Sequence, residues 1–206
     1  MYDVTATGEL LIDFTRNGLS EQNNRIYEAN PGGAPCNVLA MLGKLGYKTA
    51  FIGKVGDDEF GKLLKNTISE QKIDSTGLVM DSDAKTTLAF VDNDETGDRS
   101  FSFYRKPGAD MMLREDEVNY ELIDNCRIFH FGSLSMTDEP VRSATYAMID
   151  YAKKKNKIIS FDPNLRPPLW ESEDLATKQI WYGIEQCDIL KIADNEIEWL
   201  TGTNDY

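Results

Sequence analysis

The chain has 206 residues and a net charge of −13, with 41% hydrophobic and 28% charged residues. This composition is typical of a globular chain long enough to bury a core, and its acidic balance argues against nucleic acid or an anionic membrane surface as a partner. No apolar run reaches a membrane span, no signal peptide is visible, and three widely spaced cysteines form neither a disulfide framework nor a metal motif, so we expect a reducing, cytoplasmic setting.

The first element expected is a strand over residues 4–14, which ends in the run Leu10-Leu11-Ile12-Asp13. In doubly wound sheets, ligands bind beyond the carboxyl ends of the strands. The carboxylate of Asp13 is therefore either solvent-facing or a ligand acceptor. Residues 15–30 are polar and without a pattern, which on its own indicates a loop.

The most informative run covers residues 32–61 and reads GGAPCNVLAMLGKLGYKTAFIGKVGDDEFG. Gly32 and Gly33 precede apolar residues at helix spacing. Adjacent glycines let the backbone approach a ligand closely, and the free N–H groups of a helix start donate to ligand oxygens. Asn37 adds an amide, which suits a hydroxyl because it both donates and accepts. A turn with purely geometric glycines is the alternative to a site for a polar, oxygen-rich small molecule.

The later glycines of this run, with an acidic triplet before the last, resemble the first signature of the PfkB (ribokinase-like) carbohydrate kinases. The resemblance implies a three-layer α/β/α fold with a mostly parallel sheet and a small β lid over the sugar. Residues 1–206 would then form one incomplete ribokinase-like domain, with lid segments at about 14–30 and 86–105. The opening GELLIDF resembles fructokinase-like members, in which the aspartate matching Asp13 binds sugar hydroxyls.

A hairpin is predicted from residues 86–92 and 99–104 around a polar turn, and its aromatic side chains are expected to pack and to close over a sugar. Arg105 ends the hairpin, where an arginine is usually a solvated charge. The resemblance to fructokinases and ketodeoxygluconate kinases instead implies that Arg105 contacts the substrate, since its fork can hold two oxygens. Asp110 is expected to cap a helix or to pair with an arginine.

The remaining elements alternate between helices and strands, which predicts βαβ units and a parallel sheet. We expect helices near 61–71, 116–125, 140–156 and 177–186, and strands near 49–55, 74–79, 127–134, 158–161 and 188–193. His130, the only histidine, lies between two phenylalanines in a predicted strand, so it is assigned to the core and a His-based metal site is excluded.

Two runs near the C-terminus carry further resemblance. Residues 162–170 read DPNLRPPLW, which is either a proline-rich loop with a solvated arginine or, as the resemblance implies, a segment beside the active site. Residues 196–202 read EIEWLTG and resemble the NxxE…LTG element, although its asparagine falls on Ala193. The implied sugar ligands are Asp13, Gly32, Gly33, Asn37, Arg105 and Arg166, the implied residues for the cofactor ATP are Asn164 and Glu196, and Glu196 is implied for Mg²⁺.

The expected function is ATP-dependent phosphorylation of a small sugar, most specifically fructose. Ketodeoxygluconate kinase and ribokinase-type activities are the alternatives within that class. The second family signature, an Asp-Thr-x-Gly-Ala-Gly-Asp run that carries the catalytic base and the anion hole for phosphate, does not occur before Tyr206. We therefore expect a C-terminally truncated fragment, a shortened gene product or half of a split enzyme, with a non-catalytic sugar-binding module as the alternative. The resemblance also implies a homodimer formed through the lid.

Overall fold

The computed structural model describes residues 1–93 and 99–203, and its centre is a parallel sheet of six strands in the order β10-β9-β8-β1-β4-β5. These strands are β1 (Tyr2–Thr7), β4 (Thr49–Gly56), β5 (Ile73–Asp81), β8 (Cys126–Gly132), β9 (Ile158–Asp162) and β10 (Ile189–Leu190). All eight residues of β4 are buried. That burial matches a sequence that is apolar apart from Thr49 and Lys54, because a parallel strand covered by helices on both faces has no solvent-facing side.

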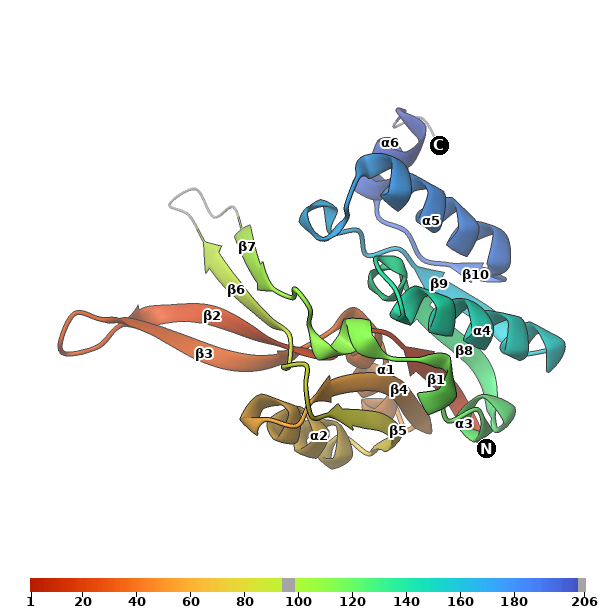
Figure 1. Ribbon diagram of the computed structural model, residues 1–206, viewed down its shortest axis with the longest axis horizontal. Helices are drawn as coiled ribbons and strands as arrows, with labels where there is room; N and C mark the ends of the chain where they lie inside the picture. The colour runs from red at the N-terminus through yellow and green to blue at the C-terminus, as the bar shows by residue number, and fades with distance from the viewer. Residues whose placement is uncertain (94–98, 204–206) are drawn as a thin grey trace.

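Helices cover both faces of the sheet (Figure 1). They are α1 (Ala34–Lys44), α2 (Glu59–Glu70), α3 (Glu121–Asp124), α4 (Val141–Lys154), α5 (Glu173–Gln186) and α6 (Asp194–Thr201). Leu39 of α1 and Leu64 of α2 pack in one core cluster with Phe51. Met148 of α4 and Ile180 of α5 belong to a second cluster on the other face. The arrangement is thus a three-layer α/β/α sandwich. Four short 3-10 helices join these elements: η1 (Ala109–Met112), η2 (Glu115–Glu117), η3 (Ser133–Met136) and η4 (Pro167–Leu169).

A second, four-stranded sheet extends from one side of the sandwich (Figure 1). Its strands are β2 (Leu11–Leu19), β3 (Arg25–Gly32), β6 (Leu88–Asn93) and β7 (Arg99–Tyr104), in the order β3-β2-β6-β7. Both expected lid segments fall in this sheet, which we call the lid sheet. Asp13 lies in register with Ala89 and Ala89 with Phe103, so these positions share one face. Phe14 and Phe90 share the opposite face and their rings stack.

The structure differs from the sequence prediction at four elements. The strand expected over residues 4–14 is two strands, because the chain turns at Gly8 and passes from the main sheet into the lid sheet. Residues 15–30, which show no pattern on their own, form the lid strands β2 and β3 with their connection. The helix expected over 116–125 is a 3-10 turn followed by a single helical turn. The last strand has two residues instead of the six expected over 188–193, and the hairpin turn at 94–98 lies outside the described residues.

Candidate active site

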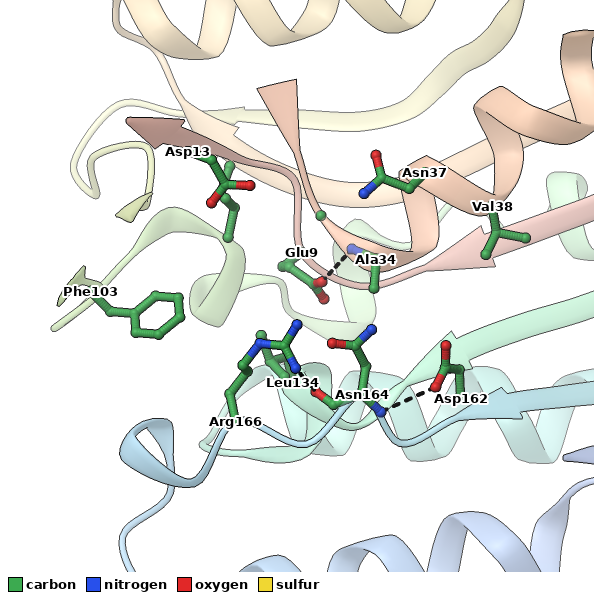
Figure 2. A pocket seen from close by; sticks show the side chains of 12 residues that line it. Glu9, Asp13, Ala34, Asn37, Val38, Phe103, Leu134, Asp162, Asn164 and Arg166 are labelled. Atoms are coloured by element: carbon green, nitrogen blue, oxygen red, sulfur yellow. Dashed lines mark hydrogen bonds between the residues drawn. The ribbon is translucent and has the colours of Figure 1, made fainter. Parts of the chain in front are cut away.

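A cleft of about 290 Å³ lies where the carboxyl ends of β1 and β9 and the start of α1 meet the lid sheet (Figure 2). Its lining consists of Glu9, Leu11, Asp13, Gly33, Ala34, Asn37, Val38, Phe103, Leu134, Asp162, Asn164 and Arg166. Five of the predicted site residues therefore come together there, from three separate stretches of sequence: Asp13, Gly33, Asn37, Asn164 and Arg166. Gly32, Arg105 and Glu196 are not among the lining residues that the structure describes.

Asp13 reaches the cleft from lid strand β2. Gly32 lies directly against this carboxylate. A Cβ at position 32 would collide with Oδ2 of Asp13, so only glycine fits there. Burial raises the pKa of the Asp13 carboxyl, and the positive charge of Arg166 opposes that shift. Arg166 thus favours the ionised form of Asp13, which accepts hydrogen bonds and donates none.

The start of α1 forms another wall of the cleft. Gly33, the N-cap residue, has φ +121° and provides no side chain to cap the helix. Instead Oε1 of Glu9 accepts a hydrogen bond of 2.7 Å from the backbone N–H of Ala34. Gly33 is required here because a Cβ would collide with the backbone oxygen of Glu9. Asn37, in the first turn, presents its amide from the same helix (Figure 2).

The loop after β9 forms the opposite wall. Asp162 ends the strand, and its Oδ1 accepts hydrogen bonds from the N–H of Asn164 at 3.2 Å and from Nζ of Lys191 at 3.3 Å. Asn164 has φ +43°, a left-handed conformation that asparagine tolerates better than most residues. Arg166 follows, and its Nη1 donates to the carbonyl of Leu165 at 3.0 Å. The turn therefore places three polar side chains within five residues on one side of the cleft.

The comparisons with known proteins agree with this architecture. The model of the pfkB family carbohydrate kinases matches residues 1–205. The chain is 46% identical over 201 residues to the probable fructokinase-2 of Arabidopsis thaliana, covering 97% of this chain and 61% of that protein. The chain belongs to the pfkB family of carbohydrate kinases.

Solved structures of the family confirm the ribokinase-like fold expected from the sequence. The fructokinase of Xylella fastidiosa superposes with a TM-score of 0.92 at 35% identity, over 98% of this chain and 63% of that one. The fructokinase of Vibrio cholerae O395, solved in a fructose, ADP and calcium ion bound form, superposes with a TM-score of 0.88 at 33% identity, over 98% of this chain and 64% of that one. This pfkB-family chain thus spans about three fifths of the length of the relatives that it matches.

Arg105 of this pfkB-family chain lies beside the cleft, within the protein. Its guanidinium donates to Oδ2 of Asp110 at 2.7 Å, to Oγ1 of Thr137 at 3.0 Å and to the carbonyl of Leu134 at 2.9 Å. Both side chains of the Arg105–Asp110 pair are 2% exposed. The arginine partner expected for Asp110 is therefore Arg105. Direct contact between Arg105 and a substrate stays a prediction, since all three guanidinium nitrogens already have protein acceptors.

Glu196 also makes structural contacts. Its Oε1 accepts from the N–H of Leu165 at 2.7 Å and its Oε2 from the N–H of Ala193 at 2.9 Å. The carboxylate thereby ties the start of α6 to the Asp162–Arg166 loop. No group of three or more His, Cys, Asp or Glu residues that could hold a metal occurs within residues 1–93 and 99–203. The role expected for Glu196 with metal and ATP stays a prediction. Within the same residues, no helix is long and apolar enough to cross a membrane.

Among the charged lining residues, Glu9 and Asp162 were not predicted from the sequence as site residues. The signal for Glu9 was present in the sequence of α1, because no Ser, Thr, Asp or Asn precedes this helix and a buried helix start needs acceptors from elsewhere. The signal for Asp162 was its position directly after a predicted strand, where the same argument singled out Asp13.

Proposed function

We propose that this chain carries the sugar-binding half of an ATP-dependent sugar kinase and that its substrate is a small neutral sugar, in first place fructose. The observation that carries the proposal is the meeting of Asp13, Asn37 and Arg166 in one cleft at the carboxyl edge of a parallel sheet. Ligands bind at that edge in open α/β sheets. The fructokinase of Vibrio cholerae, which is similar over nearly the whole chain, was solved with fructose and ADP, and this supports the same ligand class here.

The size and charge of the cleft favour a neutral sugar over a sugar acid. A volume of about 290 Å³ is at the lower end of the range for small-molecule sites, about 300–1,000 Å³, and suits a monosaccharide better than a nucleotide. Three carboxylates and one arginine line it among the described residues. The carboxylate of a ketodeoxygluconate would meet Glu9, Asp13 and Asp162, while hydroxyl groups would donate to the same oxygens.

The polar groups have complementary roles in this proposal. Asp13 accepts from sugar hydroxyls, and Asn37 both donates and accepts. Arg166 donates to sugar oxygens and favours the ionised form of Asp13. Phe103 closes the lid side and excludes water. Phosphoryl transfer then needs ATP as the donor and depends on holding the reacting hydroxyl in position.

Calorimetric titration of the 206-residue chain with D-fructose, D-ribose and 2-keto-3-deoxygluconate tests the ligand class. We expect fructose to bind most tightly. Asp13→Asn keeps the size of the side chain and removes a charged acceptor, so it should weaken fructose binding by about tenfold, in line with the loss of roughly 1.4 kcal/mol from a charge-assisted hydrogen bond. Asp83→Asn, an exposed carboxylate in the turn after β5, is the matched control and should leave the affinity unchanged. Tightest binding of the sugar acid would refute the neutral-sugar proposal.

A second candidate function is sugar binding without phosphoryl transfer by this chain. The observation that favours it is the use of both Glu196 oxygens by backbone N–H groups. A coupled assay for ADP release with fructose, ATP and Mg²⁺ separates the two candidates. Fructose binding without fructose-dependent ADP release supports the binding function, and turnover by the 206-residue chain supports the kinase.

A further inference from the structure

Glu9 is a buried carboxyl in the wall of the cleft, which the proposed function counts among the three carboxylates of the lining without assigning it an individual role. The residue is 5% exposed and lines the cleft. Oε1 is held by the N–H of Ala34. In Figure 2 the carboxyl lies between the start of α1 and the loop that carries Asn164 and Arg166, with its second oxygen toward the cleft.

The surroundings of Glu9 raise the pKa of its carboxyl toward neutral pH. Burial raises its pKa to about 7, and hydrogen bonds from the backbone N–H groups of Ala34 and of Glu9 itself oppose this shift. Asp110 of η1 raises the pKa further and Arg105 lowers it. The other titratable or charged groups around it are Cys36 of α1 and, in the cleft lining, Asp13, Asp162 and Arg166. Burial raises the pKa of Asp13 and Asp162 also, so the cleft holds three carboxyls that water does not fully solvate.

We propose that Glu9 is a sugar ligand whose first oxygen holds the start of α1 while its second oxygen accepts a hydrogen bond from a ligand hydroxyl, so that sugar binding releases a proton from Glu9. The inference rests on the proposed function, because it needs a polyol in this cleft. It goes beyond that function by assigning a further binding residue and a dependence of affinity on pH.

The direction of the pH effect follows from the chemistry of the two forms. A hydroxyl that donates to a carboxylate stabilises the ionised form, so the ligand lowers the pKa of Glu9. The free chain must then lose a proton when it binds sugar below about pH 7, and the affinity must rise with pH. If the ligand lowers this pKa by roughly 1 to 2 units, fructose binds about five- to tenfold more tightly at pH 8 than at pH 6.

The experiment is calorimetric titration with D-fructose at pH 6, 7 and 8, each in two buffers of different ionisation enthalpy, which gives affinity and proton release together. Glu9→Gln is the test variant, since an amide oxygen still accepts from Ala34 but the side chain does not titrate. Glu59→Gln is the matched control, because the side chain of Glu59 is 92% exposed on α2. A ¹³C NMR titration of uniformly labelled free wild-type protein, with Glu9 assigned through its own backbone resonances, measures the Glu9 midpoint without any ligand and without the variant.

We expect proton release and the five- to tenfold change with pH in the wild type and in Glu59→Gln, and loss of both in Glu9→Gln. Fructose binding with the same proton release in Glu9→Gln would overturn the role of Glu9 and leave the proposed function intact. A Glu9 midpoint below about pH 5.5 in the free wild type would do the same, even if Glu9→Gln failed to fold. Absence of fructose binding to the wild type at every pH would refute the proposed function and this inference with it.

Discussion

One buried carboxylate, that of Asp110, links the two ends of the lid hairpin (β6 and β7). Removing this carboxylate by mutation gives the sharpest test of the structure. Asp110 accepts from the hydroxyl of Thr87, just before β6, and from Nε of Arg105, just after β7. Arg105 in turn donates to Leu134 and Thr137 of the main body. Asp110→Ala should therefore destabilise the fold and loosen the hairpin that presents Phe103 to the cleft.

The size of the effect follows from burial. Both side chains of the pair are 2% exposed, so Asp110→Ala leaves a guanidinium charge in the interior without its counter-ion. Breaking a buried pair in this way costs about 3–5 kcal/mol. We expect about 3 kcal/mol here, because Leu134 and Thr137 still accept from Arg105. Since domains are stable by only about 5–15 kcal/mol, this loss should be large in any unfolding experiment.

Urea unfolding followed by circular dichroism measures the loss as a lower midpoint at unchanged slope. The control is Asp116→Ala, which removes one of the two carboxylate partners of Arg114, from a pair whose side chains are 56% and 74% exposed. An exposed pair of this kind contributes about 0–1 kcal/mol. If Asp110→Ala cost no more free energy of unfolding than Asp116→Ala, the assignment of Asp110 as the linking residue would be wrong.

Three further predictions concern other buried groups. Gly33→Ala should lower both the stability and the fructose affinity, because the new Cβ would collide with the backbone of Glu9. Gly46→Ala is the control, because Gly46 also has a positive φ but has open space around it, and it should cost only about 1 kcal/mol in urea unfolding. Glu196→Gln should cost about 1.5–3 kcal/mol by the same measurement, since an amide has one oxygen for two backbone donors, and unchanged stability would contradict this. Burial lowers the pKa of His130 to about 4, so the unfolded chain binds its proton more readily. About 3 kcal/mol of stability is then present above pH 6.5 and lost as pH falls from 6.5 toward 4, relative to His130→Gln.

The sequence predicted the layers of the fold well, because the spacing of apolar residues along the chain reflects which faces of a helix or strand are buried. The eight buried residues of β4 are almost continuously apolar, and the helix after Gly33 has Pro35 in its first turn as expected. What periodicity cannot show is where the chain changes sheets. Residues 4–12 are buried without interruption across the break at Gly8, although the two sides belong to different sheets.

Side-chain roles were harder to predict than side-chain positions. Asp13 was expected in the cleft from a strand end, Asn37 from a helix start and Arg166 from the family resemblance, and all three line it. Arg105 was expected to face a substrate, but no sequence pattern reveals that Asp110, Thr137 and Leu134 provide acceptors for it. Such partners are set by tertiary packing of η1 and η3 against the end of β7, which local spacing does not encode.

The glycine pair shows how the same residues serve geometry and binding together. From the sequence, Gly32 and Gly33 either shape a turn or let the backbone approach a ligand. In the structure, what approaches them is other parts of the site: the carboxylate of Asp13 lies against Gly32 and the backbone of Glu9 against Gly33. A side chain at position 32 would collide with Asp13, and one at position 33 with Glu9, before either side chain could contact a ligand. The two interpretations are therefore not alternatives, because the turn geometry is what lets both carboxyls line the cleft.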